Sequence, residues 1–223
     1  MVTGPKTSCD CCGTCCRKGG PALHTEDYDL LTAGLLSFDD LITVRQGEYV
    51  HHPMHEAPQP ADRELIKIRG KGADWCCHFL DSEKSLCMFY EHRPLACRLL
   101  KCWAPDEVIA IAGKNLLDRF SLIPENEPVA ALIRKHEEDC SLRIMHSLTA
   151  QLHIPELRKE IIDLLTVQVN LDCRIRGYAV REYNLTLARE LFYFGRPLFQ
   201  LLIPFGLSYT AAPGGEILQC VNT

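Results

Sequence analysis

The densest chemistry in this chain lies near its start, in "SCDCCGTCC", residues 8 to 16. Its spacing is Cys9-x2-Cys12-x2-Cys15, with Cys16 directly after and Cys11 as an extra thiol. Thiolates are soft ligands for zinc and iron, and two-residue gaps let successive thiolates curl around one centre. Three cysteines with two such gaps also open the bacterial ferredoxin run. The spacing therefore indicates metal binding.

A second set of cysteines follows in "CCHFLDSEKSLCMFYEHRPLACRLLKC", residues 76 to 102. It offers Cys77, Cys87, Cys97 and Cys102, with Cys76 as a neighbour. Gaps of nine, nine and four residues are too wide for a local zinc ribbon, whose ligands come as close pairs. They are typical of loops that converge on a centre from several directions.

Two further features bear on how the thiols are used. Adjacent side chains usually point apart, so Cys15 and Cys16 should either serve two centres or leave one thiol structural. Basic side chains stand beside both sets and would offset the negative charge of clustered thiolates. They are Arg17 and Lys18 in the first set, and Arg93, Arg98 and Lys101 in the second.

These residues resemble the YkgJ-type cysteine-cluster family, which is described as a zinc- or iron-chelating domain. The shared pattern is C-x2-C-x2-C-C, then C-x-F-L, a segment ending in Y-x-x-R-P, and C-R. The resemblance covers residues 9 to 102 and implies metal ligation by Cys9, Cys12, Cys15, Cys16, Cys77, Cys87, Cys97 and Cys102. Tyr90, Arg93, Pro94 and Arg98 also match, and we expect Arg17, Tyr90, Arg93 and Arg98 to lie at the cofactor.

The eight thiols leave several cofactors open. They could complete two four-ligand sites, one cluster plus one zinc, or one cluster with spare redox thiols. The ferredoxin-like gaps favour one or two iron-sulfur clusters, including a [4Fe-4S] centre, over zinc alone. The extra Cys11 and Cys76 leave the ligand assignment open by one position in each set.

Composition limits the class of protein. The 223 residues include 13 cysteines, and 24 basic against 29 acidic residues give no field that would attract nucleic acid. The start has no apolar segment typical of a secretory signal, so we expect a cytoplasmic protein, where dense cysteines bind metal more often than they form disulfides. Residues 191 to 211 are interrupted by Pro197 and Pro204, which argues against a membrane span and for a buried helical segment or a partner surface.

The pattern of apolar residues predicts a mainly α fold with an irregular, metal-organised cysteine-rich N-terminal half. We expect a metal-binding region at residues 1–104 and an α-helical region at 105–223, packed as one unit. Helices are predicted over 105–120, 126–148, 154–169 and 181–194. The apolar stripes of the second and third consist of Val129, Leu132, Ile133, Cys140, Ile144 and Leu148, and of Leu157, Ile161, Leu164 and Leu165.

Histidines, acidic residues and the remaining cysteines also suggest local roles. "HHPMHE", with His51, His52 and His55, could coordinate a metal but is typical of a solvated loop. Asp27 is expected to cap the helix that follows it. The remaining expectations are that His78 and His92 tune a cluster from behind its ligands, that residues 137–139 form an exposed acidic face, and that Cys140, Cys173 and Cys220 are buried thiols.

Three functions compete on this basis. The first is an iron-sulfur protein with a redox or cluster-assisted modification role, which would need a protein or redox partner. The second is a non-enzymatic zinc-stabilised interaction module. The third, implied by the similarity of flagellin lysine methylases in the same cysteine motif, is a protein-modifying methyltransferase, although the sequence has no recognisable loop for S-adenosylmethionine. Whether the chain is an enzyme stays open.

Overall fold

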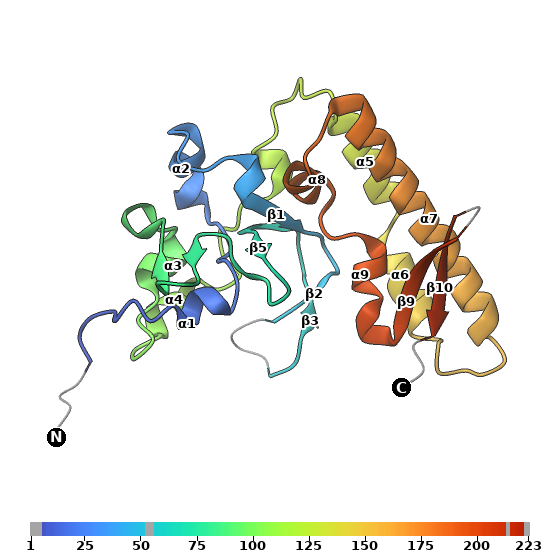
Figure 1. Ribbon diagram of the computed structural model, residues 1–223, viewed down its shortest axis with the longest axis horizontal. Coiled ribbons are helices and arrows are strands. Elements are labelled where there is room, and N and C mark those ends of the chain that lie inside the picture. The colour runs from blue at the N-terminus through green and yellow to red at the C-terminus, as the bar shows by residue number, and fades with distance from the viewer. Residues whose placement is uncertain (1–5, 52–55, 213–214, 221–223) are drawn as a thin grey trace.

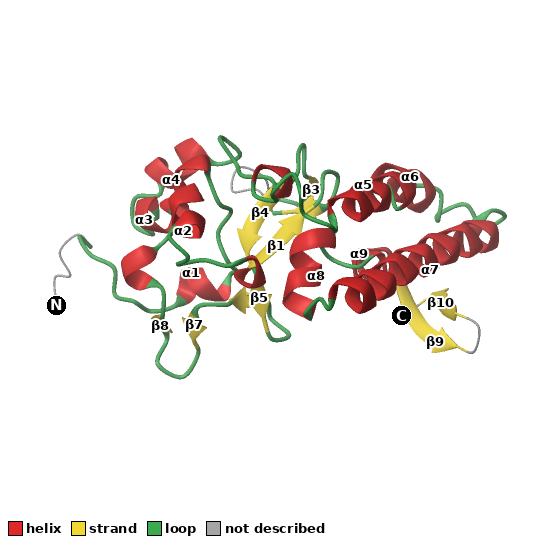
Figure 2. Ribbon diagram, turned by 90° about the horizontal axis from the view of Figure 1, so that it is seen from above, coloured by secondary structure: helices red, strands yellow, loops and turns green. Residues whose placement is uncertain are grey.

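The computed structural model describes residues 6–51, 56–212 and 215–220. The cysteine-rich segments lie at one end of an elongated molecule and the longer helices lie at the other, with a two-stranded sheet between them (Figures 1 and 2). The fold is mainly α, which confirms the predicted class. Within the described residues, no helix is long and apolar enough to cross a bilayer.

The central sheet pairs β1 (Leu41–Val44) with β4 (Leu65–Ile68) in antiparallel register, with Leu41 opposite Ile68. All four residues of β1 are buried, as expected for a strand covered on both faces. Helix α8 (Leu187–Phe194) packs on one face, where the Thr43 hydroxyl donates a hydrogen bond to the Phe192 carbonyl. The sequence analysis did not predict this sheet.

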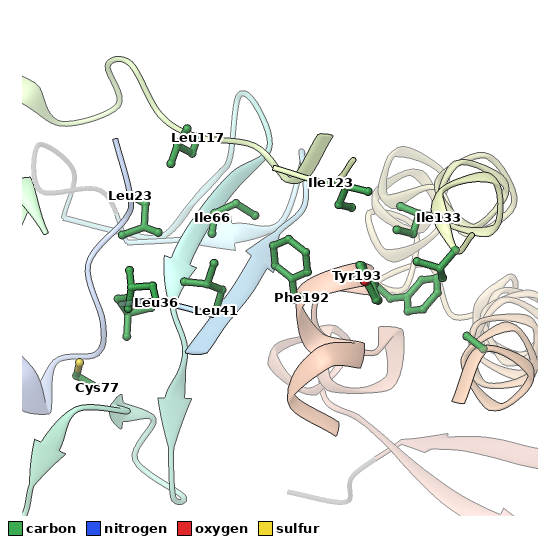
Figure 3. Packing of buried hydrophobic residues seen from close by; sticks show 14 of the residues in the cluster. Leu23, Leu36, Leu41, Ile66, Cys77, Leu117, Ile123, Ile133, Phe192 and Tyr193 are labelled. Atoms are coloured by element: carbon green, nitrogen blue, oxygen red, sulfur yellow. The ribbon is translucent and has the colours of Figure 1, made fainter. Parts of the chain in front are cut away.

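The main hydrophobic cluster joins the two ends of the molecule (Figure 3). It contains Leu23, Ile66 and Cys77 from the cysteine-rich part, together with Ile133 and Phe192 from the helical part. Residues from both sides of position 104 therefore share one core.

The cysteine-rich end is built from short elements that suit tight turns. Helices α1, α2, α3 and α4 span Thr14–Arg17, Tyr28–Thr32, Leu95–Leu99 and Asp106–Ile111, and 3-10 turns span Thr25–Asp27, Phe38–Asp40 and Tyr90–His92. Three further antiparallel pairs are β2 (Tyr49–Val50) with β3 (Gln59–Pro60), β5 (Gly70–Lys71) with β6 (Cys76–Cys77), and β7 (Leu80–Asp81) with β8 (Leu86–Cys87).

The helical end consists of α5 (Ala130–Asp139), α6 (Leu142–Thr149), the long α7 (Arg158–Tyr183) and α9 (Leu198–Leu201). A second hydrophobic cluster lies between α6, α7 and α9. The hairpin β9–β10 (Leu207–Ala212 with Gly215–Cys220) packs against α7. Short 3-10 turns at Arg119–Ser121 and Ile203–Phe205 complete the part of the chain that the structure describes.

The predicted helix boundaries need correction. The helix predicted over 105–120 ends at Ile111. The helix predicted over 126–148 is two helices, because the backbone of Cys140 leaves helical geometry (φ −111°, ψ 44°), and this break turns Ile144 toward solvent. The helix predicted over 154–169 begins at Arg158 and continues to Tyr183, so Leu157 precedes it, and Leu157 and Leu164 are exposed. A left-handed Asn184 ends it, so Arg181 belongs to α7 and α8 begins at Leu187.

The late segment, residues 191–211, is not a continuous helix. It includes the end of α8, the short helix α9, a 3-10 turn and the start of β9. Leu198, Leu201 and Leu202 are buried in the second cluster, so most of the apolar character of this segment serves the core.

Candidate metal centre

The two sets of cysteines meet at one cavity of about 250 Å³ at the cysteine-rich end of the molecule. Residues 9–18, the β7–β8 hairpin and helix α3 with the segment after it form its walls. Figure 2 shows α1, α3, β7 and β8 together at this end of the molecule. Seven of the eight motif cysteines line it: Cys9, Cys12, Cys15, Cys16, Cys87, Cys97 and Cys102. Cys77, the eighth, is buried and does not line the cavity. Its charge raises the pKa of Cys16 and Cys97, which indicates that it lies close to both. Segments nearly 90 residues apart therefore present their thiols to one space.

A glycine sets the path of the first loop. Gly13 has φ 71°, and a methyl group at this position would lie 2.9 Å from Arg17 Nη1 and 3.2 Å from the Ser85 carbonyl oxygen. Only glycine meets both requirements without strain. The close approach lets the loop and the β7–β8 hairpin lie against each other.

Arg17 joins these two walls directly. Its Nη1 donates to the Cys12 carbonyl at 2.8 Å, and its Nη2 donates to Ser85 Oγ at 2.6 Å. Arg17 does not line the cavity. The expected cofactor residue thus acts in this structure as a clamp between the two cysteine-bearing loops.

The second set of thiols is carried by two hairpins and a helix. Cys77 lies opposite Gly70 in the β5–β6 pair, and Cys87 lies opposite Leu80 in the β7–β8 pair. In each hairpin the pairing fixes the cysteine on a short strand beside a tight turn.

Helix α3 carries Cys97, and a distant carboxylate holds the start of that helix. Pro94 precedes its first turn, and Asp27 Oδ1 accepts a hydrogen bond from the Leu95 N–H at 2.7 Å. The other oxygen of Asp27 accepts from the His24 N–H at 2.9 Å. The prediction that Asp27 caps the following helix is met only in part: its side chain makes no cap bond to α2, but with His24 it forms a capping box on the 3-10 turn that leads into α2, and it also secures α3.

Cys15 and Cys16 do not point apart as expected. Both face the cavity from the single turn of α1, and their sulfur atoms are 4.0 Å apart. Hydrogen bonding to Cys16 lowers the pKa of Cys15 to about 6 and that of Cys87 to about 6, while the pKa of Cys16 is strongly raised. Cys16 therefore holds a proton between two thiolates.

The deeper thiols resist ionisation. Burial, and next the charges of Cys77 and Cys15, raise the pKa of Cys97 to about 12. Burial also raises the pKa of Cys77. Without a positive ion between them these sulfur atoms keep their protons, because gathering several thiolates in one buried space is unfavourable.

Arg93 supplies positive charge to the cavity. It lines the cavity, its guanidinium stacks 3.7 Å from the centre of the Tyr90 ring, and it lowers the pKa of Cys15 and Cys87. Tyr90 lines the cavity as well. Arg98 differs, because it is exposed on α3 and lies outside the lining.

The outer side of the cavity is formed by thiols that are partly exposed. Cys9, Cys12 and Cys102 are exposed, and the Cys9 sulfur accepts a hydrogen bond from the Cys11 N–H at 3.4 Å. Lys6 lines this side, 5.5 Å from the Trp103 ring centre. The sequence analysis missed Lys6 and Trp103, which lack any metal-binding pattern of their own.

The two extra cysteines are placed differently. Cys11 lines the cavity with a left-handed backbone (φ 51°). Cys76 lies outside the lining, and its thiol donates to the Arg17 carbonyl at 3.7 Å.

The predicted histidine roles find little support in the geometry. His78 and His92 do not line the cavity. His78 instead lies 3.4 Å from Asp40 Oδ1. His51 is exposed, whereas His52 and His55 lie outside the described residues.

A second group of potential ligands lies in the helical end, at His136, Cys140 and Asp172. Burial is confirmed for Cys140, Cys173 is partly buried, and the Cys220 side chain lies outside the described part. Asp172 accepts hydrogen bonds from Arg176 Nε at 2.8 Å and the Leu198 N–H at 2.9 Å, and lies 2.6 Å from His136 Nε2. Because the Asp172 oxygens are occupied and Arg176 lies beside them, this group is a poor site for a cation, although His136 Nδ1 is buried without a hydrogen-bond partner.

The acidic stretch 137–139 is also corrected. Glu137 is not on an exposed face, because its carboxylate accepts hydrogen bonds from Arg45 Nε at 2.8 Å and from Arg119 Nη2. Both arginine side chains are fully buried. Glu138 alone of the two glutamates faces solvent.

Sulfur separations describe what the cavity could hold. Among the described residues, the single group of three ligands whose atoms all lie within 4.8 Å of one another is His136, Cys140 and Asp172. No three motif sulfurs meet that limit. Around one tetrahedral zinc, Zn–S bonds of about 2.3 Å would place sulfurs roughly 3.8 Å apart.

Comparison with known proteins agrees with the geometry. The family model CxxCxxCC, described as a zinc- or iron-chelating domain, matches residues 8–140. That range contains every cysteine of the cavity and extends through α5. Searches of curated proteins and of solved structures gave no match. The chain belongs to the CxxCxxCC family of zinc- or iron-chelating domains.

Proposed function

We propose that this protein binds an iron-sulfur cluster, of the [4Fe-4S] type, in the cysteine cavity and uses it in a redox or cluster-assisted modification role. One observation carries the proposal: seven motif cysteines from three separate segments line a single cavity, with the eighth buried beside them. Soft thiolates in this number suit iron-sulfur chemistry.

The electrostatics of the cavity support a bound cationic centre. Cys77 and Cys97 keep their protons because of burial and neighbouring thiolates, so metal binding would release protons and replace mutual repulsion with coordination. Arg93 would balance the remaining negative charge of a thiolate-bound cluster.

The number of thiols at the cavity favours a cluster over one zinc ion, because seven motif cysteines line it and a single tetrahedral ion takes four ligands. The ferredoxin-like spacing of Cys9, Cys12 and Cys15 points in the same direction.

The cavity has an inner and an outer group of thiols, which suits one or two centres. Cys16, Cys77, Cys87 and Cys97 are buried or partly buried and form the inner group, and the exposed Cys15 joins them through its hydrogen bond with Cys16. Cys9, Cys12 and Cys102 form the outer, exposed group. We propose the inner group as the source of ligands for the first cluster. The exposed outer edge would let a redox partner approach.

The test is anaerobic purification followed by iron, sulfide and zinc analysis and electron paramagnetic resonance after reduction. We expect iron and sulfide in equal amounts, about four of each per cluster. Cys97→Ala should lose most of this iron, whereas Cys76→Ala should keep it, because Cys97 lines the cavity and Cys76 does not. Zinc as the sole metal, with no signal after anaerobic reconstitution, would exclude the cluster.

That zinc result would favour the second function, a zinc-stabilised interaction module. The printed family description includes zinc, and thiolate-only zinc sites are common structural sites. The module predicts that chelation unfolds the cysteine-rich end and that no redox couple exists. In the described residues we find no feature that supports the methyltransferase alternative.

A further inference from the structure

A second, larger cavity of about 570 Å³ lies beside the cysteine cavity. Its floor is the face of the β1–β4 sheet that points away from α8. Because side chains alternate along a strand, the paired residues Ile42 and Lys67, and Val44 and Leu65, share this face. Thr43 is on the other face, against α8. The sheet thus separates the core from an open pocket.

The walls of this cavity are largely apolar. Helix α4 contributes Val108 and Ile111, and Trp75 closes the side next to the β5–β6 hairpin. Cavities of this size with apolar walls and a few polar groups are typical of small-molecule sites. The cavity therefore has the volume and the lining to bury the apolar body of a ligand.

One positive charge inside the cavity, the Lys67 ammonium, has no directly paired counterion among the described residues, although the charges of Glu48 and Cys77 act on it from a distance. Glu48, the acidic residue of the lining, is already engaged, because its Oε1 accepts from Arg196 Nε at 2.6 Å. Among the described residues no hydrogen bond or ion pair is found for the Lys67 ammonium. Lys18, exposed at the rim, adds a second unpaired positive charge. An unpaired ammonium in an apolar pocket creates a place for an anion.

We propose that this cavity binds an organic anion with an apolar body, whose negative group pairs with the Lys67 ammonium and whose apolar part packs on Ile42, Val108 and Ile111. The backbone of Lys67 is fixed by its pairing with Ile42 in the sheet, which places the lysine side chain on the cavity face. Burial, and next the charge of Arg196, lower the pKa of Lys67, so a bound anion would relieve the unfavourable environment of this ammonium.

The cavity also neighbours the thiols. Lys18 lines both cavities, and the charge of Cys77 raises the pKa of Lys67. An anion held by Lys67 would lie next to the metal centre. The proposal does not depend on which metal the centre holds.

The test uses the full chain as purified, with its metal, and three probes of equal length: octanoate, octanol and octylamine. Isothermal titration calorimetry should show octanoate binding about tenfold or more tighter than octanol, and octylamine weakest, because the pocket is positive. Metal analysis of each preparation reports the cysteine centre separately, so loss of either site is recognised on its own.

Variants assign the effect to Lys67. Lys67→Met should weaken octanoate binding about tenfold while leaving octanol within about threefold, and Lys67→Arg should keep octanoate binding. Val108→Trp, which fills the apolar wall, should weaken both ligands. Lys159→Met, an exposed lysine on α7, is the matched control and should change neither.

The proposal is overturned if octanoate does not bind, if it binds no more tightly than octanol, or if Lys67→Met leaves its affinity unchanged. An effect of Lys159→Met equal to that of Lys67→Met would also overturn it, because general charge attraction would then explain the binding.

Discussion

The two ends of this molecule bury polar groups in opposite ways. At the helical end, Arg45, Arg119, His136, Asp172 and Arg176 are buried with partners from their own chain. At the cysteine end, thiols are gathered where they raise one another's pKa and share protons. The helical end is nearly complete in its pairing, with Arg45 Nη1 and His136 Nδ1 left without a hydrogen-bond partner, whereas we expect the thiols to need a bound cation before they all ionise. This difference locates the functional end without reference to any relative.

The largest expected effect comes from removing the metal. Chelation should strongly increase hydrogen exchange in β5–β8 and α3 while α7 stays protected, because structural metals contribute several kcal/mol to folding. Hydrogen-exchange mass spectrometry measures both ends at once. The same chelator should change nothing in Cys87→Ala if that variant already lacks metal. An equal increase in hydrogen exchange at both ends would contradict the proposed difference between them.

The second largest effect should come from breaking a buried ion pair at the helical end. Glu137→Gln leaves the buried Arg45 without its carboxylate and should lower the free energy of unfolding by about 3 kcal/mol, since Arg119 keeps its pair with Glu64. Urea denaturation measures this. Glu138→Gln, on the exposed face, is the matched control and should cost almost nothing. Metal content should be unchanged in both, and a loss of metal would show that the ends are coupled.

Acid should weaken the same network in a defined range. Burial opposes ionisation of Asp172, but Arg176 and the His136 hydrogen bond outweigh it and lower its pKa from 3.8 to about 2. This carboxylate therefore stabilises the fold above pH 3.8, and its contribution of about 2 kcal/mol is lost as the pH falls to about 2. Asp172→Asn should be less stable than wild type at pH 5, with the gap narrowing toward pH 2. Exposed Asp163→Asn should show no such gap.

The smallest expected effect comes from comparing Gly13→Ala with Gly34→Ala. This comparison separates the cost of backbone strain from the cost of a steric clash in the cysteine loop. Gly13 and Gly34 have nearly equal φ (71° and 69°), yet a methyl group would meet nothing within 4 Å at Gly34 and three close atoms at Gly13. Gly34→Ala should cost about 1 kcal/mol from backbone strain alone and keep the metal. Gly13→Ala should cost about 1 kcal/mol more and lower the metal content. Equal loss in both would mean that the contact with Arg17 is unimportant.

Sequence reasoning predicted the thiols well because ligand spacing is a local pattern. The gaps indicated two cysteine sets, the family resemblance implied the eight motif cysteines, and seven of these line one cavity. The short strands around them were missed because pairs of two residues leave no periodic signal. Spacing could not decide whether Cys76 or Cys77 belongs to the second set of ligands. In the structure the two differ in burial, because Cys77 is buried and Cys76 is partly exposed.

The helical end shows where long-range contacts override local patterns. The helix predicted over 154–169 in fact continues to Tyr183 through Gly177, supported by the Asp172–Arg176 pair one turn apart. The opposite error occurred at Cys140, where an apolar stripe suggested continuity and the backbone bends. The role of Glu137 depends on Arg45, 92 residues away, and no local pattern could indicate it.

The hydrogen bond from the Leu95 N–H to Asp27 has a consequence for the order of events during synthesis. It joins positions 68 residues apart, and the start of helix α3, which carries Cys97, depends on it. The first cysteines leave the ribosome long before their partners, and the cavity closes only after the second set has emerged and docked. Metal loading is therefore a late step, and the early thiols must wait in a reduced form until the chain behind them is made.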